Sequence, residues 1–245
     1  MITTRIAVIA GEPRAHVELA VGALAPRLIS RDALRAHVAV TAAGMVLLGG
    51  DHVHIEIDVG PGCTLEIEDV GGTVAYRGTR SSWNLVVRIG TGGTLLWHGL
   101  PFVVTDGADV ERRSCMTLEA HARAVIRETL VLGRHGERGG RLISTLAVDD
   151  GGGPIVFERL DADGTAPEPG VLGGNRVIDA VTAVGFRPPT RPTDLEFDQP
   201  GAMARHLSDH THGSPLDPVW DAWIAHAHER IRTRDPERSR VDATP

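Results

Sequence analysis

The chain of 245 residues contains no lysine and has only two cysteines, Cys63 and Cys115. Because all its permanently basic side chains are arginines and the formal net charge is −7, we expect no general phosphate-binding surface and no nucleic-acid partner. The cysteines form no C-x-x-C pair. The N-terminal apolar run, residues 6–10, is too short for a secretory signal. These features predict a cytoplasmic protein with reduced thiols.

Long apolar runs and aromatic residues are also scarce. No window reaches the roughly 18 uninterrupted apolar residues that a membrane-spanning helix needs, so we expect a soluble protein with no membrane partner. Aromatic residues make up 4% of the chain, which leaves the core to aliphatic side chains. The sequence lacks G-x-S-x-G, G-x-x-x-x-G-K-[ST], H-E-x-x-H and a G-x-G-x-x-G that opens a helix after a strand. The motifs of the common enzyme classes are therefore missing.

The strongest positive feature is a repeat. Residues 59–67, 89–97 and 118–126 follow the same pattern, with spacings of 30 and then 29 residues. In each unit an alternating apolar and polar strand leads into a tight, mostly glycine-rich turn and a second strand. The repeat predicts a mainly β fold of stacked, hairpin-like strand-turn-strand units, either a β-superhelix or sandwich-like, with a few C-terminal helices.

We expect residues 1–234 to form a single β-rich domain, because all-β folds of this length are commonly undivided. Apolar residues after residue 175 recur at helical spacing and end at a glycine, which predicts a helix over about 176–185. A second helix is predicted over 217–233, with proline in its first turn and an apolar stripe along one side. Residues 235–245 are expected to be a disordered tail.

Histidine and carboxylate side chains alternate with Val and Ile along residues 52–59. This pattern places His52, His54, Glu56 and Asp58 on one face of a strand. Imidazole and carboxylate suit Ni, Zn, Fe or Mn, so the face could hold a metal. It could equally be the solvent side of a half-buried sheet, which needs polar residues at every second position.

A second group of histidines lies near the C-terminus. His206 and His210 stand four residues apart, which is a metal-ligand spacing if a helix extends that far. His212, His226 and His228 follow. The alternative is that these histidines are solvated in a polar segment.

Several short motifs occur along the chain in a characteristic order. They are LLGGD at 47–51, VGPG at 59–62, VAYR at 74–77, Leu96-Trp97 with Pro101, DGA at 106–108, and Gly133-Arg134 with Gly136-Glu137. Their order over about residues 20 to 160 resembles the urease accessory protein D family, also called H. The chain departs from the family at residues 68–70 and at Val74, where members usually have Thr-Gln and a Lys, and in the Trp-x-Pro-Glu motif.

The resemblance implies a non-enzymatic, β-rich scaffold for urease maturation. Such a scaffold binds accessory protein F, and through it the GTPase G, and docks on the urease apoprotein so that nickel reaches the active site. The family implies no tightly bound cofactor, with nickel in transit through an internal tunnel. The resemblance also allows a homodimer within the accessory complex.

Carboxylates on strands could line such a passage and bind a divalent ion reversibly. The predicted nickel-path residues are Asp51, His52, His54, Glu66, Glu68, Glu128 and Glu137. Arg134 is predicted to hold a carboxylate in place or to contact a partner. Trp220 and Trp223 of the last helix are predicted anchors at a partner interface, with packing onto the sheet as the alternative for both.

A different function class remains open from the sequence alone. His52 and His54 followed by Asp58 could belong to a metal-dependent enzyme on a cupin-like barrel. That class needs a further histidine on a later strand, and His98 is the candidate nearby. A purely structural repeat protein is a third interpretation.

Overall fold

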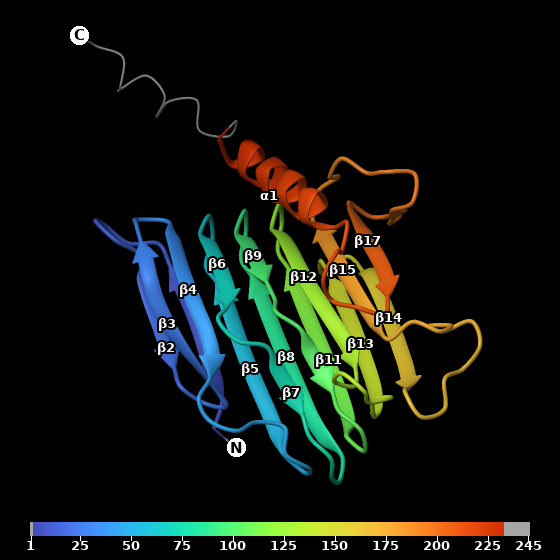
Figure 1. The fold of residues 1–245 in the computed structure, drawn as a ribbon. Helices are drawn as coiled ribbons and strands as arrows, with labels where there is room; N and C mark the ends of the chain where they lie inside the picture. The colour runs from blue at the N-terminus through green and yellow to red at the C-terminus, as the bar shows by residue number, and fades with distance from the viewer. Residues whose placement is uncertain (1, 233–245) are drawn as a thin grey trace.

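The computed structural model describes residues 2–232 as two stacked β-sheets with one helix beside them (Figure 1). The strands of sheet A are, in spatial order, β14 (Pro154–Asp163), β13 (Arg141–Asp149), β11 (Asp109–Leu118), β8 (Ser81–Ile89), β5 (His52–Val59), β1 (Thr4–Ile9) and β2 (His16–Ala20). Those of sheet B are β16 (Leu195–Glu196), β17 (Gly201–Ser208), β15 (Val177–Val184), β12 (Arg123–Leu132), β9 (Thr94–His98), β6 (Thr64–Asp69), β4 (Arg35–Ala42) and β3 (Leu24–Arg31). The short strands β7 (Thr73–Ala75) and β10 (Phe102–Val104) pair with each other, and β10 also pairs with β12. The predicted tail at 235–245 lies outside the described residues.

The repeat in the sequence corresponds to one coil of a solenoid. β5 pairs in parallel with β8, so that His52 lies opposite Ser82, and β6 pairs with β9, so that Thr64 lies opposite Thr94. In the next coil Thr94 lies opposite Arg123. These partners are 30 and 29 residues apart, as the repeat predicts. The mainly β, stacked fold is therefore confirmed.

The units are not hairpins, however. The two strands of each repeated unit lie in different sheets, because the chain crosses from sheet A to sheet B at the turn and each strand pairs with strands of neighbouring coils. Outside the repeat, β1–β2, β3–β4 and β13–β14 are antiparallel hairpins within one sheet. The turns stack as well: Gly62 N donates to Thr91 O at 2.9 Å, and Gly92 N donates to Ala120 O at 2.9 Å. Gly62, Gly92 and His121 have φ of 67°, 66° and 64°, so the third turn adopts the left-handed conformation without a glycine.

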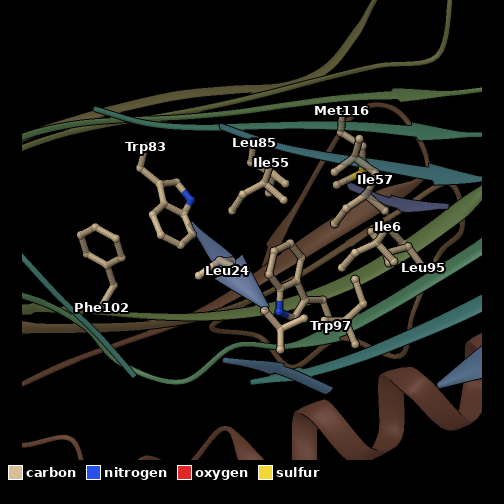
Figure 2. Packing of buried hydrophobic residues seen from close by; sticks show 14 of the residues in the cluster. Ile6, Leu24, Ile55, Ile57, Trp83, Leu85, Leu95, Trp97, Phe102 and Met116 are labelled. Atoms are coloured by element: carbon tan, nitrogen blue, oxygen red, sulfur yellow. The ribbon is translucent and has the colours of Figure 1, made fainter. Parts of the chain in front are cut away.

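The core fills the space between the two sheets. Val53, Ile55 and Ile57 of β5 point inward from sheet A, and Leu65 and Ile67 of β6 point inward from sheet B. Figure 2 shows this packing, in which the rings of Trp83 and Phe102 meet edge to face with centroids 5.5 Å apart. The alternation of buried and polar residues along each strand therefore decides which side chains face the interior.

The predicted helix over 176–185 is wrong, because this segment is strand β15. It pairs antiparallel with both β12 and β17. Both faces of the strand are covered: Ile178 and Val184 face the core, whereas Val181 and Ala183 face outward beneath the helix. A strand that is buried on both sides carries apolar residues on both faces, so apolar and polar residues no longer alternate. The apolar residues can then fall at the spacing of a helix.

Helix α1 (Asp217–Arg232) confirms the predicted second helix and packs on the outer face of sheet B at β12 and β15, towards one end of the strands (Figure 1). Val219, Trp223 and Ala227 pack on Val125 of β12 and Val181 of β15. Within residues 2–232, no helix has the length and apolar character that a membrane crossing needs.

A buried ionic cluster fastens the start of α1 to sheet B. Arg127 donates through Nε and Nη2 to Asp179, at 3.3 and 2.8 Å, and through Nη1 to Asp217 at 2.6 Å. Thr129 also donates to Asp179, at 3.1 Å. Burial opposes ionisation of Asp179, but hydrogen bonds from Arg127, Ser214 and Thr129 and the charge of Arg127 outweigh it and lower the pKa of Asp179. The cluster thus holds the carboxylate ionised.

We expect Asp179→Ala to lower the free energy of unfolding by about 3–5 kcal/mol, because it leaves the guanidinium of Arg127 buried without its main partner. Asp161→Ala is the control. Asp161 pairs with Arg141 at 3.1 Å at the surface, so its loss should cost about 0–1 kcal/mol. Urea denaturation at neutral pH measures both, and equal effects of the two substitutions would contradict the importance of the cluster.

Candidate functional site

Charged side chains meet inside the solenoid, between the two sheets. Glu128 shares a face of β12 with Ala124 and Ile126, which belong to or pack on the core. Arg112 reaches in from β11 of sheet A and is 8% exposed. Its Nη2 donates to Oε1 of Glu128 across the interior. The Glu128 side chain keeps 27% of its surface exposed, so a partly buried ion pair links the two sheets.

Three cavities between the sheets have Glu128 in common. The first, of about 50 Å³, is also lined by Asp69, Trp83 and Arg112. The second, of about 20 Å³, includes Ser114. The third, of about 100 Å³, lies between β13, β14, β15 and β17. Glu128 thus lines every member of this series of three separate spaces, and we call its position the junction.

Asp69 is a second interior carboxylate, which is not among the site residues predicted from the sequence. Trp97 Nε1 and the backbone N–H of Leu100 each donate to it at 3.0 Å. Burial raises the pKa of Asp69, against the lowering effect of those two hydrogen bonds. A signal was available: Asp69 continues the inward row of Leu65 and Ile67, where an apolar residue is expected.

Several buried polar atoms around this junction have no hydrogen-bond partner among the described residues. They are Trp83 Nε1 and Arg112 Nε, which line the first cavity, and Ser114 Oγ, which lines the second. Unsatisfied polar groups beside a cavity are where water molecules or ions bind in proteins. The interior is thus polar at its centre, although aliphatic side chains surround it.

The far end of the series is also polar. Arg205 of β17 pairs with Glu158 of β14 at 2.6 Å, so that a second ion pair joins sheet B to sheet A. Both residues line the third cavity, together with Ser144 and Thr182. Charged groups therefore occur at two places along the interior.

His52 and His54 do not lie between the sheets. They lie on the outer face of sheet A, where His52 Nδ1 is 2.8 Å from Ser82 Oγ and His54 Nε2 is 3.3 Å from Glu56 Oε1. Glu56 and Asp58 are paired with Arg5 at 3.0 and 2.9 Å. No group of three metal-binding side chains occurs in residues 2–232. The strand therefore shows the alternation expected of a solvent face.

Glu66 and Glu68 lie on the outer face of sheet B and do not line the interior. Glu66 Oε1 is 3.8 Å from His228 Nε2 of α1, and Glu68 Oε2 is 3.4 Å from His37 Nε2 of β4. They occupy alternate positions to Leu65 and Ile67, so the same strand periodicity that brings Asp69 inward turns them out.

Asp51, Glu137 and Arg134 lie in turns between strands. Asp51 Oδ2 accepts a hydrogen bond from Leu48 N at 2.9 Å. Glu137 accepts from Arg134 Nη2 at 2.6 Å and from Arg134 N at 2.9 Å. These bonds lower the pKa of Glu137 to about 2. Among the five predicted carboxylates, Glu128 is thus the one between the sheets.

The two tryptophans of α1 differ in accessibility. Trp223 is 1% exposed and donates through Nε1 to Pro189 O at 2.8 Å, so it packs onto the sheet and is not available as an anchor. Trp220 is partly exposed, and its ring meets that of His98 at a centroid distance of 5.1 Å.

The second histidine group does not form a helical metal site. His206 lies on strand β17, and His210 follows in the loop after it. The two therefore share no helix face. The rings of His210 and His212 stack at 5.2 Å, and His226 stacks on Phe186 at 5.9 Å.

The turn carboxylate Glu137 makes stability depend on pH. Because its pKa is lower in the folded state than the ordinary 4.5, its contribution is complete above about pH 4.5 and is lost as the pH falls towards 2. We expect Glu137→Gln to reduce stability at pH 6 and to approach the wild type at pH 2–3. Thermal unfolding across this range tests the expectation, with Glu12→Gln, at an exposed carboxylate, as the control. A constant difference at every pH would refute it.

Comparison with known proteins gives a consistent result. The family model described as UreD urease accessory protein matches residues 21–217. Urease accessory protein UreD 1 of Streptomyces griseus is 44% identical over 199 residues, which are 78% of this chain and 77% of the relative. Urease accessory protein UreD of Streptomyces avermitilis is 31% identical over 202 residues, which are 80% and 77% of the two chains. The resemblance in the sequence motifs is thus confirmed, and the chain belongs to the UreD family of urease accessory proteins.

Proposed function

We propose that this protein is a scaffold for urease maturation that docks on the urease apoprotein, binds accessory protein F and through it the GTPase G, and passes nickel along its interior. Membership of the UreD family supports the role in maturation. The observation that carries the nickel path is Glu128, a carboxylate shared by three cavities between the sheets. Oxygen ligands of this kind bind a divalent ion reversibly.

Glu128 and Asp69 are the carboxylates that we assign to the path. Both face the first cavity, from neighbouring parts of sheet B. Asp51, Glu66, Glu68 and Glu137 are not assigned to it, because turns or the outer faces hold them. Nickel is cargo in this proposal, and the protein needs no resident metal.

The partner surface that we propose is the exposed side of α1 around Trp220. An aromatic ring that is partly exposed and already ordered by His98 loses little conformational entropy on binding. Arg134 is a weaker candidate, since its guanidinium is engaged by Glu137. The homodimer expected from the resemblance stays a prediction.

The maturation role is tested by reconstitution. Urease subunits, accessory proteins F and G and nickel are combined with and without this chain, and urease activity and bound nickel are measured. We expect both to fall to background when the chain is omitted, because the metal has no protected route to the apoprotein. Full activity without the chain would refute the role.

The path is tested by Glu128→Gln, which removes the shared carboxylate and should reduce the rate of activation by about tenfold or more, the scale of losses seen when a metal environment is altered. Glu66→Gln and Glu68→Gln are matched controls on the outer face of the same sheet and should activate normally. Circular dichroism establishes that each variant is folded, and co-purification shows whether it still binds its partners. A folded Glu128→Gln variant with normal activation would exclude this path.

A further inference from the structure

The guanidinium of Arg112 occupies the same carboxylate that a cation in the interior would need. Glu128 is common to the three cavities, and Arg112 is bound to it from the opposite sheet. Arg112 is 8% exposed and itself lines the first cavity. A metal ion that passes the junction must therefore compete with this side chain for the oxygens of Glu128.

Arg112 is held by few contacts for a buried arginine. Its Nη2 donates to Glu128, but its buried Nε has no partner among the described residues. The guanidinium also lies over the ring of Phe102, 5.7 Å from the centroid. By contrast, Arg127 donates through three nitrogens to Asp179 and Asp217. Arg127 is locked in place, whereas the head of Arg112 can leave Glu128 at the cost of one ion pair.

A second carboxylate lies in the same cavity for the displaced guanidinium. Asp69 lines the first cavity with Arg112, and the charge of Arg112 already favours the ionised form of Asp69. Trp97 and the backbone of Leu100 hold the Asp69 carboxylate in a fixed position. A guanidinium that leaves Glu128 therefore remains beside a negative charge, which limits the cost of moving it through a buried environment.

We propose that Arg112 is an internal gate, a displaceable counter-cation that closes the junction at Glu128 until a divalent cation takes its place. The inference rests on the proposed nickel path and adds its control. In the closed state the Arg112–Glu128 pair balances its own charge and keeps the interior free of loosely bound ions. In the open state Glu128 binds the cation, and Arg112 turns towards Asp69.

The test measures Ni²⁺ binding to the purified full-length chain by isothermal titration calorimetry, without urease or other accessory proteins. Arg112→Gln removes the competing charge, so we expect it to bind Ni²⁺ about tenfold or more tightly than the wild type. Adding Glu128→Gln to this variant should abolish the gain. Unchanged affinity in a folded Arg112→Gln variant would overturn the proposal, as would a gain that survives the loss of Glu128.

Arg113→Gln is the matched control. Arg113 is the next residue on β11 but lies on the outer face, paired with Glu111, so its loss should leave Ni²⁺ affinity unchanged. Arg112→Met serves if Arg112→Gln does not fold. It removes the competing charge and keeps a long side chain, so tighter binding than wild type is again expected, and wild-type affinity counts against the gate.

This experiment separates the gate from the maturation role. If omission of the chain leaves urease fully active while Arg112→Gln still gains affinity through Glu128, the maturation role fails and the interior remains a gated cation site. If omission abolishes activation but Arg112→Gln gains no affinity, the scaffold role holds and the gate is wrong.

Discussion

The parallel register between successive coils is the constraint on which the rest of the structure depends. The coils from β5 to β12 lie on one another with offsets of 30 or 29 residues, both in sheet A and in sheet B. A shift of one residue would turn every side chain of a strand to the opposite face. The register therefore decides at once which residues form the core, which form the two outer faces and which charged groups meet inside.

The interior charges are costly in a core of this kind. A buried ion pair often contributes no more to stability than well-packed apolar residues of the same size would. Within residues 2–232, Arg112 Nε and Trp83 Nε1 are buried without a hydrogen-bond partner, and both line the first cavity. Such an arrangement is poorly suited to stabilising the fold. Both atoms are N–H donors, so water molecules or another acceptor in the cavity would supply the contacts that they lack.

The two ionic clusters of sheet B illustrate different uses of the same chemistry. Arg127 and Asp179 lie on the outer face beneath α1, where bidentate bonds and a second carboxylate, that of Asp217, fix the helix to the sheet. Glu128, the next residue along β12, points the other way and holds a single guanidinium inside. Adjacent residues of one strand thus serve a structural clamp and a candidate passage, because successive side chains of a strand alternate between faces.

The sequence by itself determined the solenoid, since the 30- and 29-residue spacing and the alternation within strands are local patterns that reappear directly as the register of the coils. It also determined the last helix, whose apolar stripe packs as expected. It failed at β15, where burial on both faces imitates helical spacing, and it assigned Glu66 and Glu128 to one path although they lie on opposite faces of sheet B. Only the tertiary structure decided which carboxylates share a cavity, because a charged residue in an inward row pairs with a group from the opposite sheet, and that partner depends on how the two sheets stack.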